Sequence, residues 1–311
     1  MKSMMNQVHL EGWVYEHDLS LKESGPKSKN PGTQFISGTL SIATDNACLN
    51  VVPVHFTYVT ATTNKGNPNA TFNTLKGIID GAIKTVMAAG QDKAGKVRVD
   101  TAIGLNEFYT DRNGKEELVV AKRNEGGFVH TCDALNEDEK LRNTFKCDML
   151  ITGATRIEAN PDRDIPEKVI VKGAIFDFRK ALLPVEFTAL NPNAMNYYED
   201  LNASQSNPVL TTLWGRQISE TVVRKTVEES AFGEAYVRET TNTRKDFVIT
   251  GGSKEPMVWD DESTMTVAEL KEAIAARETH LATVKQRNDE YKASLGATPS
   301  IAAPSNDQFN F

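Results

Sequence analysis

The sequence PVHFT at residues 53–57 returns as PVEFT at residues 184–188, an offset of 131 residues (184 − 53). Strand-like runs stand around both copies in the same order. They are VHLEGWV (8–14), FISGTLSI (35–42) and TAIG (101–104) in the first copy, and MLITGAT (149–155), VIVKGAIF (169–176) and TLWG (212–215) in the second. Their shared glycines are offset by 141 (153 − 12), 135 (173 − 38) and 111 (215 − 104). Since loops vary more readily than strands, this order predicts a duplicated β domain with shorter loops in the second copy.

Length and composition favour an intracellular globular protein. The 311 residues leave room for two domains of ordinary size. No apolar run is long enough for a bilayer, and the N-terminus has no apolar signal core, so we expect a cytoplasmic protein without a membrane partner. Cys48, Cys132 and Cys147 lack metal-ligand spacing. We therefore expect free thiols, with no disulfide framework, metal site or cofactor.

The charge is distributed unevenly along the chain. A net charge of −7 argues, taken alone, against a nucleic-acid partner, because such proteins usually carry a basic surface. Residues 254–311 hold six Lys/Arg and ten Asp/Glu, a net −4 (6 − 10), which leaves −3 for residues 1–253. The β body is thus close to neutral and compatible with a local basic groove. The alternative is a mildly acidic protein with no polyanion partner.

The first copy shows the element order of a small barrel. Apolar residues alternate at 8–14, which predicts a half-buried strand with Trp13 and Tyr15 on its outer face. Strands are expected at about 35–43 and 51–59, a helix at 71–89, and a further strand from 97. The tetrapeptide DRNG at 111–114 predicts a hairpin. Strand, strand, strand, helix, hairpin is the order of the OB-fold.

The C-terminal part predicts a helix and a flexible tail. Thr266 and Glu269 form a capping box, which opens a helix at about 263–295. Its apolar residues follow a seven-residue repeat from Val267 to Tyr291 that Arg277 and Asn288 interrupt. This seam is typical either of a coiled coil, and so of a homo-oligomer, or of an amphipathic helix packed on its own body. Residues 296–311 have the composition of disorder.

Several of these segments resemble bacterial and phage single-stranded DNA-binding proteins. NQVHLEGWV (6–14) is similar to the opening strand of that family, in which an Asn, alternating aliphatics and a Gly recur. Residues 32–45, the run VRV (97–99) and DRNGKE (111–116) are similar to its second, fourth and fifth strands, and the terminal Phe to its tail. The resemblance covers residues 6–132 and is weaker in the second copy, which lacks the Asn opening.

The resemblance implies a mainly β fold and a binding function. We expect two tandem OB-fold-like barrels, at residues 1–135 and 145–252, followed by the helix and the disordered tail. It also implies non-catalytic binding of single-stranded DNA in replication or recombination, in a bacterial virus. The rival interpretation is a structural or assembly protein whose duplicated barrels make protein–protein contacts. The phosphate-binding loop, the zinc-protease motif and the hydrolase elbow are absent from the sequence, which argues against an enzyme.

Candidate site residues follow from how single strands are held, on aromatic faces beside cationic side chains. The predicted DNA-binding residues are Trp13, Tyr15, Phe35, Lys96, Arg98, Tyr109, Arg112, Lys115, Arg179, Trp214 and Arg216, with Lys122 and Arg123 as further phosphate candidates. For each aromatic, a core role is the alternative, because aromatic side chains also dominate cores. At the tip of the tail, Asp307, Phe309 and Phe311 predict an anchor for a replication protein.

Overall fold

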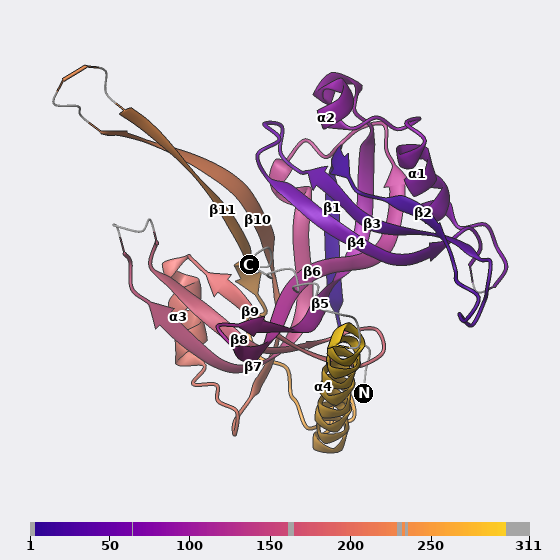
Figure 1. Cartoon of the computed structure of the whole chain (residues 1–311). Coiled ribbons are helices and arrows are strands. Elements are labelled where there is room, and N and C mark those ends of the chain that lie inside the picture. The colour runs from indigo at the N-terminus through magenta and orange to yellow at the C-terminus, as the bar shows by residue number, and fades with distance from the viewer. Residues whose placement is uncertain (1–3, 64, 161–164, 229–231, 234–235, 297–311) are drawn as a thin grey trace.

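A computed structural model of the chain describes residues 4–63, 65–160, 165–228, 232–233 and 236–296 (Figure 1). The tail residues Asp307, Phe309 and Phe311, predicted as a partner anchor, lie outside the described residues. Among the helices that are described, none is both long enough and apolar enough to cross a membrane.

The first copy is a closed five-stranded barrel. Around the barrel the order is β1-β3-β4-β6-β5 and back to β1, with β4 and β6 parallel and the other neighbours antiparallel. The strands are β1 (Asn6–His17), β3 (Gln34–Ala43), β4 (Val51–Thr60), β5 (Lys96–Arg112) and β6 (Lys115–Thr131). A short strand, β2 (Ser20–Glu23), extends β3 at the sheet edge, and α1 (Ala70–Ile79), α2 (Val86–Ala89) and η1 (Gln91–Lys93) connect β4 to β5. This is the OB-fold arrangement.

The second copy repeats this barrel. Its ring runs β7-β8-β9-β11-β10 and back to β7, again with one parallel pair, β9 and β11. The elements are β7 (Asn143–Ile157), β8 (Lys168–Phe176), β9 (Leu182–Ala189), α3 (Pro192–Asp200), β10 (Val209–Glu228) and β11 (Tyr236–Gly252), with η2 (Glu139–Leu141) leading into β7. The predicted fold class, two tandem OB-fold-like barrels, is confirmed. Beyond the barrel, β10 and β11 continue as a long two-stranded arm (Figure 1).

The structure corrects how the two copies align. Asn6 accepts a hydrogen bond from the Ile103 amide (3.0 Å) and donates one to the Ile103 carbonyl (2.9 Å). Asn143 makes the same two bonds with the backbone of Gln217, at 3.2 and 2.6 Å. The second copy therefore does open on an Asn, 137 residues after the first (143 − 6), and not at the offset of 141 that the glycines of these strands gave.

The motifs PVHFT (53–57) and PVEFT (184–188) lie in equivalent strands, β4 and β9, but are two residues out of register with each other. Val14 pairs with Ile42, and Ile151, which lies 137 residues after Val14, pairs with Gly173, so Gly173 corresponds to Ile42 and not to Gly38. Ile42 pairs with Val52 on β4, and Gly173 pairs with Val185 on β9. That is an offset of 133 (185 − 52) instead of 131. Because side chains alternate along a strand, a shift of two leaves the same residues on the same face. The motif therefore revealed the duplication without giving its register.

The two barrels share one sheet and one core. Residues 6–10 of β1 pair antiparallel with residues 143–147 of β7, which joins the barrels into an eleven-stranded sheet. A single cluster of buried side chains extends from Leu10 and Leu75 in the first barrel to Phe187 and Met195 in the second. Between the barrels, buried Gln217 and Asn124 exchange two amide hydrogen bonds, at 2.9 and 3.0 Å. The polar groups at this boundary are thus paired, as burial requires.

The C-terminal helix α4 (Val267–Gly296) packs against the β5–β6 hairpin of the first barrel. Its first turn is closed by the predicted capping box: the Thr266 amide donates to Glu269 Oε2 (3.0 Å), and the Glu269 amide donates to Thr266 Oγ1 (3.2 Å). A second apolar cluster, which includes Phe176 and Met265, anchors this end of the helix on the second barrel. The helix thus contacts both barrels.

Candidate nucleic-acid interface

The pairing of β1 with β7 creates one continuous outer face across the barrels. Val8 and Leu10 point into the core, so the residues between them point outward. The ladder then places outward side chains in rows across β5, β1, β7, β10 and β11. One row is Arg98–Glu11, the next is Asp100–His9–Thr144, and the third is Gln7–Lys146–Trp214–Gly251. We call this surface the shared face.

Trp214 is an exposed aromatic platform at the second-barrel end of the shared face. Its side chain is 39% exposed, and the Lys146 ammonium lies 5.9 Å from the ring centroid. The ring rests on Gly251 of the neighbouring strand, where any Cβ would collide with the indole. Glycine is therefore what lets the indole lie against the backbone. Arg216, also exposed, follows on the same side of β10. An aromatic plane held beside cations suits base stacking and phosphate contact.

Trp13 lies at the first-barrel end of the shared face and is less available. It is half-buried, directly opposite Lys96 on β5. The Arg142 guanidinium sits 5.6 Å from the ring centroid, and Asn46 Oδ1 accepts from that guanidinium at 2.7 Å. One face of the indole is thus occupied by a fixed cation. Sequence alternation placed Trp13 outward correctly but could not reveal Arg142.

The centre of the shared face is acidic, whereas its ends are basic. His9 Nδ1 lies 2.7 Å from Asp100, and His9 Nε2 lies 3.3 Å from Glu11. Arg98 approaches Asp100 at 3.8 Å. Lys96 is on one side of this group, and Lys146 is on the other. A bound strand would therefore meet its strongest cationic contacts at the two ends.

A second aromatic group lies on β3 and β4, the strands that bind ligands in many OB-folds. The rings of Phe35 and Tyr58 are 4.5 Å apart, and the Tyr58 hydroxyl lies 3.2 Å from Ser24 Oγ on the loop after β2. Tyr58 is 49% exposed. Tyr58 is exposed because β4 passes the end of the core after Phe56. Tyr15, another predicted residue, is half-buried on β1.

The distal part of the β5–β6 hairpin, beyond the β5 residues of the shared face, packs against α4. The Lys285 ammonium of the helix lies 5.6 Å from the Tyr109 ring, and Lys285 pairs with Glu116 at 2.7 Å. Exposed Arg112 and Lys115 are at the hairpin tip. The structure therefore does not bring Tyr109, Arg112 and Lys115 together with the two tryptophans.

The turn between β8 and β9 presents an aromatic side chain and a cation. Asp177 Oδ1 accepts from the amides of Arg179 and Ala181, both at 2.8 Å, which fixes the turn. Phe178 is 87% exposed, and the Arg179 guanidinium lies 5.0 Å from its ring centroid. Arg179 was predicted as a site residue on this pattern, and the turn holds it at the surface.

Lys122 is not a surface phosphate contact, which corrects the prediction. Its ammonium is buried between the rings of Phe187 and Phe247, at 5.2 and 4.9 Å from their centroids, and donates to the Glu186 carbonyl. Burial lowers the pKa of Lys122 to about 8. Arg123, the next candidate, pairs with Glu125. Residue type made Lys122 a phosphate candidate, but the sequence could not show the second barrel against it.

The cysteines and acids form no metal centre in the described part of the chain. Cys48, Cys132 and Cys147 are free thiols, and burial raises the pKa of Cys147. No group of three metal-ligating side chains occurs among the residues that the structure describes.

Comparison with known proteins gives structural neighbours of low similarity and one family. The crystal structure of the wild-type single-stranded DNA binding protein from Thermus aquaticus is similar at 12% sequence identity and a TM-score of 0.43. The match covers 84% of this chain and 98% of that chain. A deletion mutant of the same protein matches at 10% sequence identity and a TM-score of 0.44. That match covers 84% of this chain and 100% of the mutant chain. No curated protein matches the chain. The family described as YorF matches residues 5–287, and the chain therefore belongs to the YorF family.

Proposed function

We propose that the protein binds single-stranded DNA without catalysis, along the shared face. The observation that carries this proposal is the Trp214 platform, which is exposed, seated on Gly251 and accompanied by Lys146. Base stacking is sequence-tolerant, because every base has a π-face, and lysines beside the ring supply phosphate contacts. The lysines at the two ends of the shared face supply the local positive charge that phosphate binding needs, although the protein as a whole is acidic.

The finer parts of the proposal concern the biological setting. We propose that the protein acts in DNA replication or recombination of a bacterial virus, where it protects single strands. In this proposal Asp307, Phe309 and Phe311 recruit a replication protein, because two aromatic side chains and a carboxylate close together in sequence form a peptide anchor. Self-association also remains a proposal.

The rival function is assembly through protein–protein contacts. The β10–β11 arm favours it, because the arm extends from the second barrel and exposes Phe232, Tyr236 and Val237. Exposed apolar side chains on an extended element are typical of interaction sites. An arm used only for assembly would leave DNA affinity untouched, so the binding experiment separates the two functions.

The experiment is an anisotropy titration of labelled oligo-dT with the full chain at 50 and 200 mM salt. We expect binding at low salt that weakens at high salt, with log K against log salt falling by about 0.7 per phosphate contact. A duplex of the same length is the control and should bind more weakly, since its bases are unavailable for stacking. Absence of oligo-dT binding at 50 mM salt would exclude the proposed function.

A further inference from the structure

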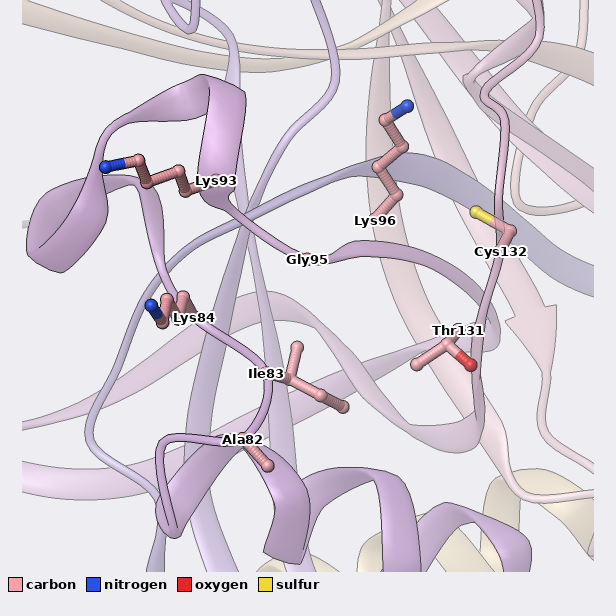
Figure 2. Close-up of a pocket in the computed structure, with 8 residues that line it drawn as sticks. All are labelled: Ala82, Ile83, Lys84, Lys93, Gly95, Lys96, Thr131 and Cys132. Atoms are coloured by element: carbon pink, nitrogen blue, oxygen red, sulfur yellow. The ribbon is translucent and has the colours of Figure 1, made fainter.

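A cavity opens beside the first-barrel end of the shared face. It has a volume of about 500 Å³ and lies between the connection that follows α1 and the paired ends of β5 and β6 (Figure 2). Its lining residues are Ala82, Ile83, Lys84, Lys93, Gly95, Lys96, Thr131 and Cys132. Small-molecule sites fall in the same range of volume.

Three lysines and no carboxylate line the cavity, while burial, together with Glu11 and Asp133 near its wall, raises the pKa of Cys132. None of Lys84, Lys93 and Lys96 forms an ion pair within the described part of the chain, and Lys96 Nζ donates only to the Asp133 carbonyl, at 3.2 Å. Figure 2 shows Lys84 and Lys93 extending on one side of Gly95 and Lys96 on the other. By contrast, Lys285 and Lys292 on α4 each pair with two carboxylates. In a protein of net charge −7, three unpaired ammonium groups around one cavity favour an anion.

The walls of the cavity are fixed by the barrel. The Val14 amide of β1 donates to the Gly95 carbonyl at 2.9 Å, and the Gly95 amide donates to the Lys84 carbonyl at 2.8 Å. A Cβ on Gly95 would collide with the Ile83 side chain. The connection can therefore approach the sheet only with glycine at position 95. The site is formed before any ligand arrives, which limits the ordering cost of binding.

We infer that this cavity holds a phosphorylated nucleotide of the bound single strand. The inference rests on the proposed function and names the place where the strand leaves the shared face. Lys96 is common to both surfaces, because it lines the cavity and is the β5 partner of Trp13. The three lysines supply the phosphate contacts, and Ala82, Ile83 and the Thr131 methyl supply an apolar wall for a base or sugar.

The test is a double variant, Lys84→Gln with Lys93→Gln, titrated with oligo-dT over a range of salt. Both side chains are exposed, so the variant should keep the wild-type melting temperature. We expect affinity at 50 mM salt to fall on the order of 3- to 10-fold, and the salt slope to shrink by about 0.7 for each phosphate contact that the substitutions remove. The matched control is Lys254→Gln with Lys271→Gln, which removes two charges from exposed positions elsewhere and should change neither quantity.

The outcomes separate this inference from the function on which it rests. Wild-type protein that ignores oligo-dT overturns both. Wild-type binding with an unchanged affinity and slope in the Lys84/Lys93 variant overturns the cavity assignment alone. A calorimetric titration with thymidine 5′-monophosphate distinguishes the source of the phosphate. If the Lys84/Lys93 variant loses its affinity for the mononucleotide and keeps its affinity for oligo-dT, the cavity binds a free nucleotide. The inference that it holds a nucleotide of the bound strand is then wrong.

Discussion

At the residue scale, Trp214 is the side chain on which DNA affinity should depend most. Trp214→Ala is expected to weaken oligo-dT binding by about 1–3 kcal/mol, the contribution of one stacked base, with little loss of stability, because the ring is partly exposed. Gly251→Ala should weaken binding in the same direction while the tryptophan remains, since the added Cβ displaces the indole. Titration of both variants with oligo-dT measures this.

Trp259 provides the control for the Trp214 prediction. It packs against the second apolar cluster and is not one of the residues that form the shared face. Trp259→Phe should therefore leave oligo-dT affinity unchanged. An unaltered affinity in Trp214→Ala, or a loss confined to Trp259→Phe, would show that bases do not stack on Trp214.

Lys122 should make stability depend on pH above neutrality. Its pKa is about 8 in the folded protein and near 10.5 when unfolded, so between these values the unfolded chain binds the extra proton. The free energy of unfolding therefore rises with pH across that window, by up to about 3 kcal/mol, as the buried ammonium loses its proton. Below pH 8 the full cost of burying the charge remains. The Lys122→Met variant has no titratable group at this position, so its unfolding free energy should lack this rise with pH.

Urea unfolding of wild type and Lys122→Met at pH 7, 8.5 and 10 is the measurement. The difference in unfolding free energy between the two proteins should shift in favour of wild type as pH rises. Parallel pH profiles would mean that Lys122 keeps an ordinary pKa in the folded protein.

Local sequence could identify outward positions at this scale, but not what covers them. Alternation along β1 correctly placed Trp13 on the outer face, and Arg142 covers it from a segment far along the chain. Lys122 was a phosphate candidate by its charge, but its ammonium lies against Phe187 and Phe247 of the second barrel. Neither partner is near in sequence, so only the fold reveals the contact.

At the element scale, α4 turns the two polar interruptions of its heptad seam toward the β5–β6 hairpin, whereas Ile274 and Tyr291 of the same seam are exposed. Arg277 donates to Glu107 of β5, and Asn288 donates to Glu116 of β6 at 2.7 Å. Both polar residues that break the apolar repeat thus bond to the hairpin. The sequence left a coiled coil and a packed helix as alternatives, because periodicity does not show which surface a helix faces. Self-association through α4 stays a prediction, for which Ile274 and Tyr291 are exposed.

Arg277 should be the most important polar contact of α4. Glu107 is 4% exposed and Arg277 is 12% exposed, and the pair includes a bond of 2.8 Å from Arg277 Nη1 to Glu107 Oε2. Arg277→Ala leaves a buried carboxylate with only His280, at 3.1 Å, and should cost about 3 kcal/mol. Lys292→Ala removes the two solvent-exposed ion pairs to Asp111 and Glu116 and should cost clearly less than Arg277→Ala.

Chemical denaturation of the two α4 variants measures these costs. Equal losses in Arg277→Ala and Lys292→Ala would indicate that the Arg277–Glu107 pair is solvated like a surface ion pair. Sedimentation of the Arg277→Ala variant adds a check on assembly. If the substitution frees the apolar repeat of α4 from the hairpin and the helix then pairs with a second copy, the mass of the particle should increase.

At the scale of the whole molecule, the two barrels should unfold together. They share the β1–β7 ladder, one buried cluster and the Gln217–Asn124 amide pair. We expect one urea transition, with circular dichroism and tryptophan fluorescence coincident. Gln217→Ala removes two of the three hydrogen bonds of the Asn124 side chain and should lower the unfolding free energy by about 1–3 kcal/mol. Two resolved wild-type transitions would contradict this shared core.

The duplication itself could be predicted from sequence, whereas its joining could not. The strand order and the repeated PV-FT motif indicated two barrels, because hydrophobic alternation is a local property. The alignment of Gly12 with Gly153 was wrong by four residues, since short glycine motifs do not fix register. The bonds of Asn6 and Asn143 to β5 and β10 fix it instead. The shared face depends on β1–β7 pairing, for which the sequence carries no local signal.

Photo-cross-linking of oligo-dT to the full chain, with mapping of the cross-linked peptides, tests the central claim most directly. The claim is that one strand lies along a face common to both barrels. We predict cross-links in peptides that contain Trp214 on β10 and in β1 around Trp13, both suppressed by excess unlabelled oligo-dT. Cross-links restricted to the β5–β6 hairpin and α4, or to one barrel with Trp214 untouched, would contradict it.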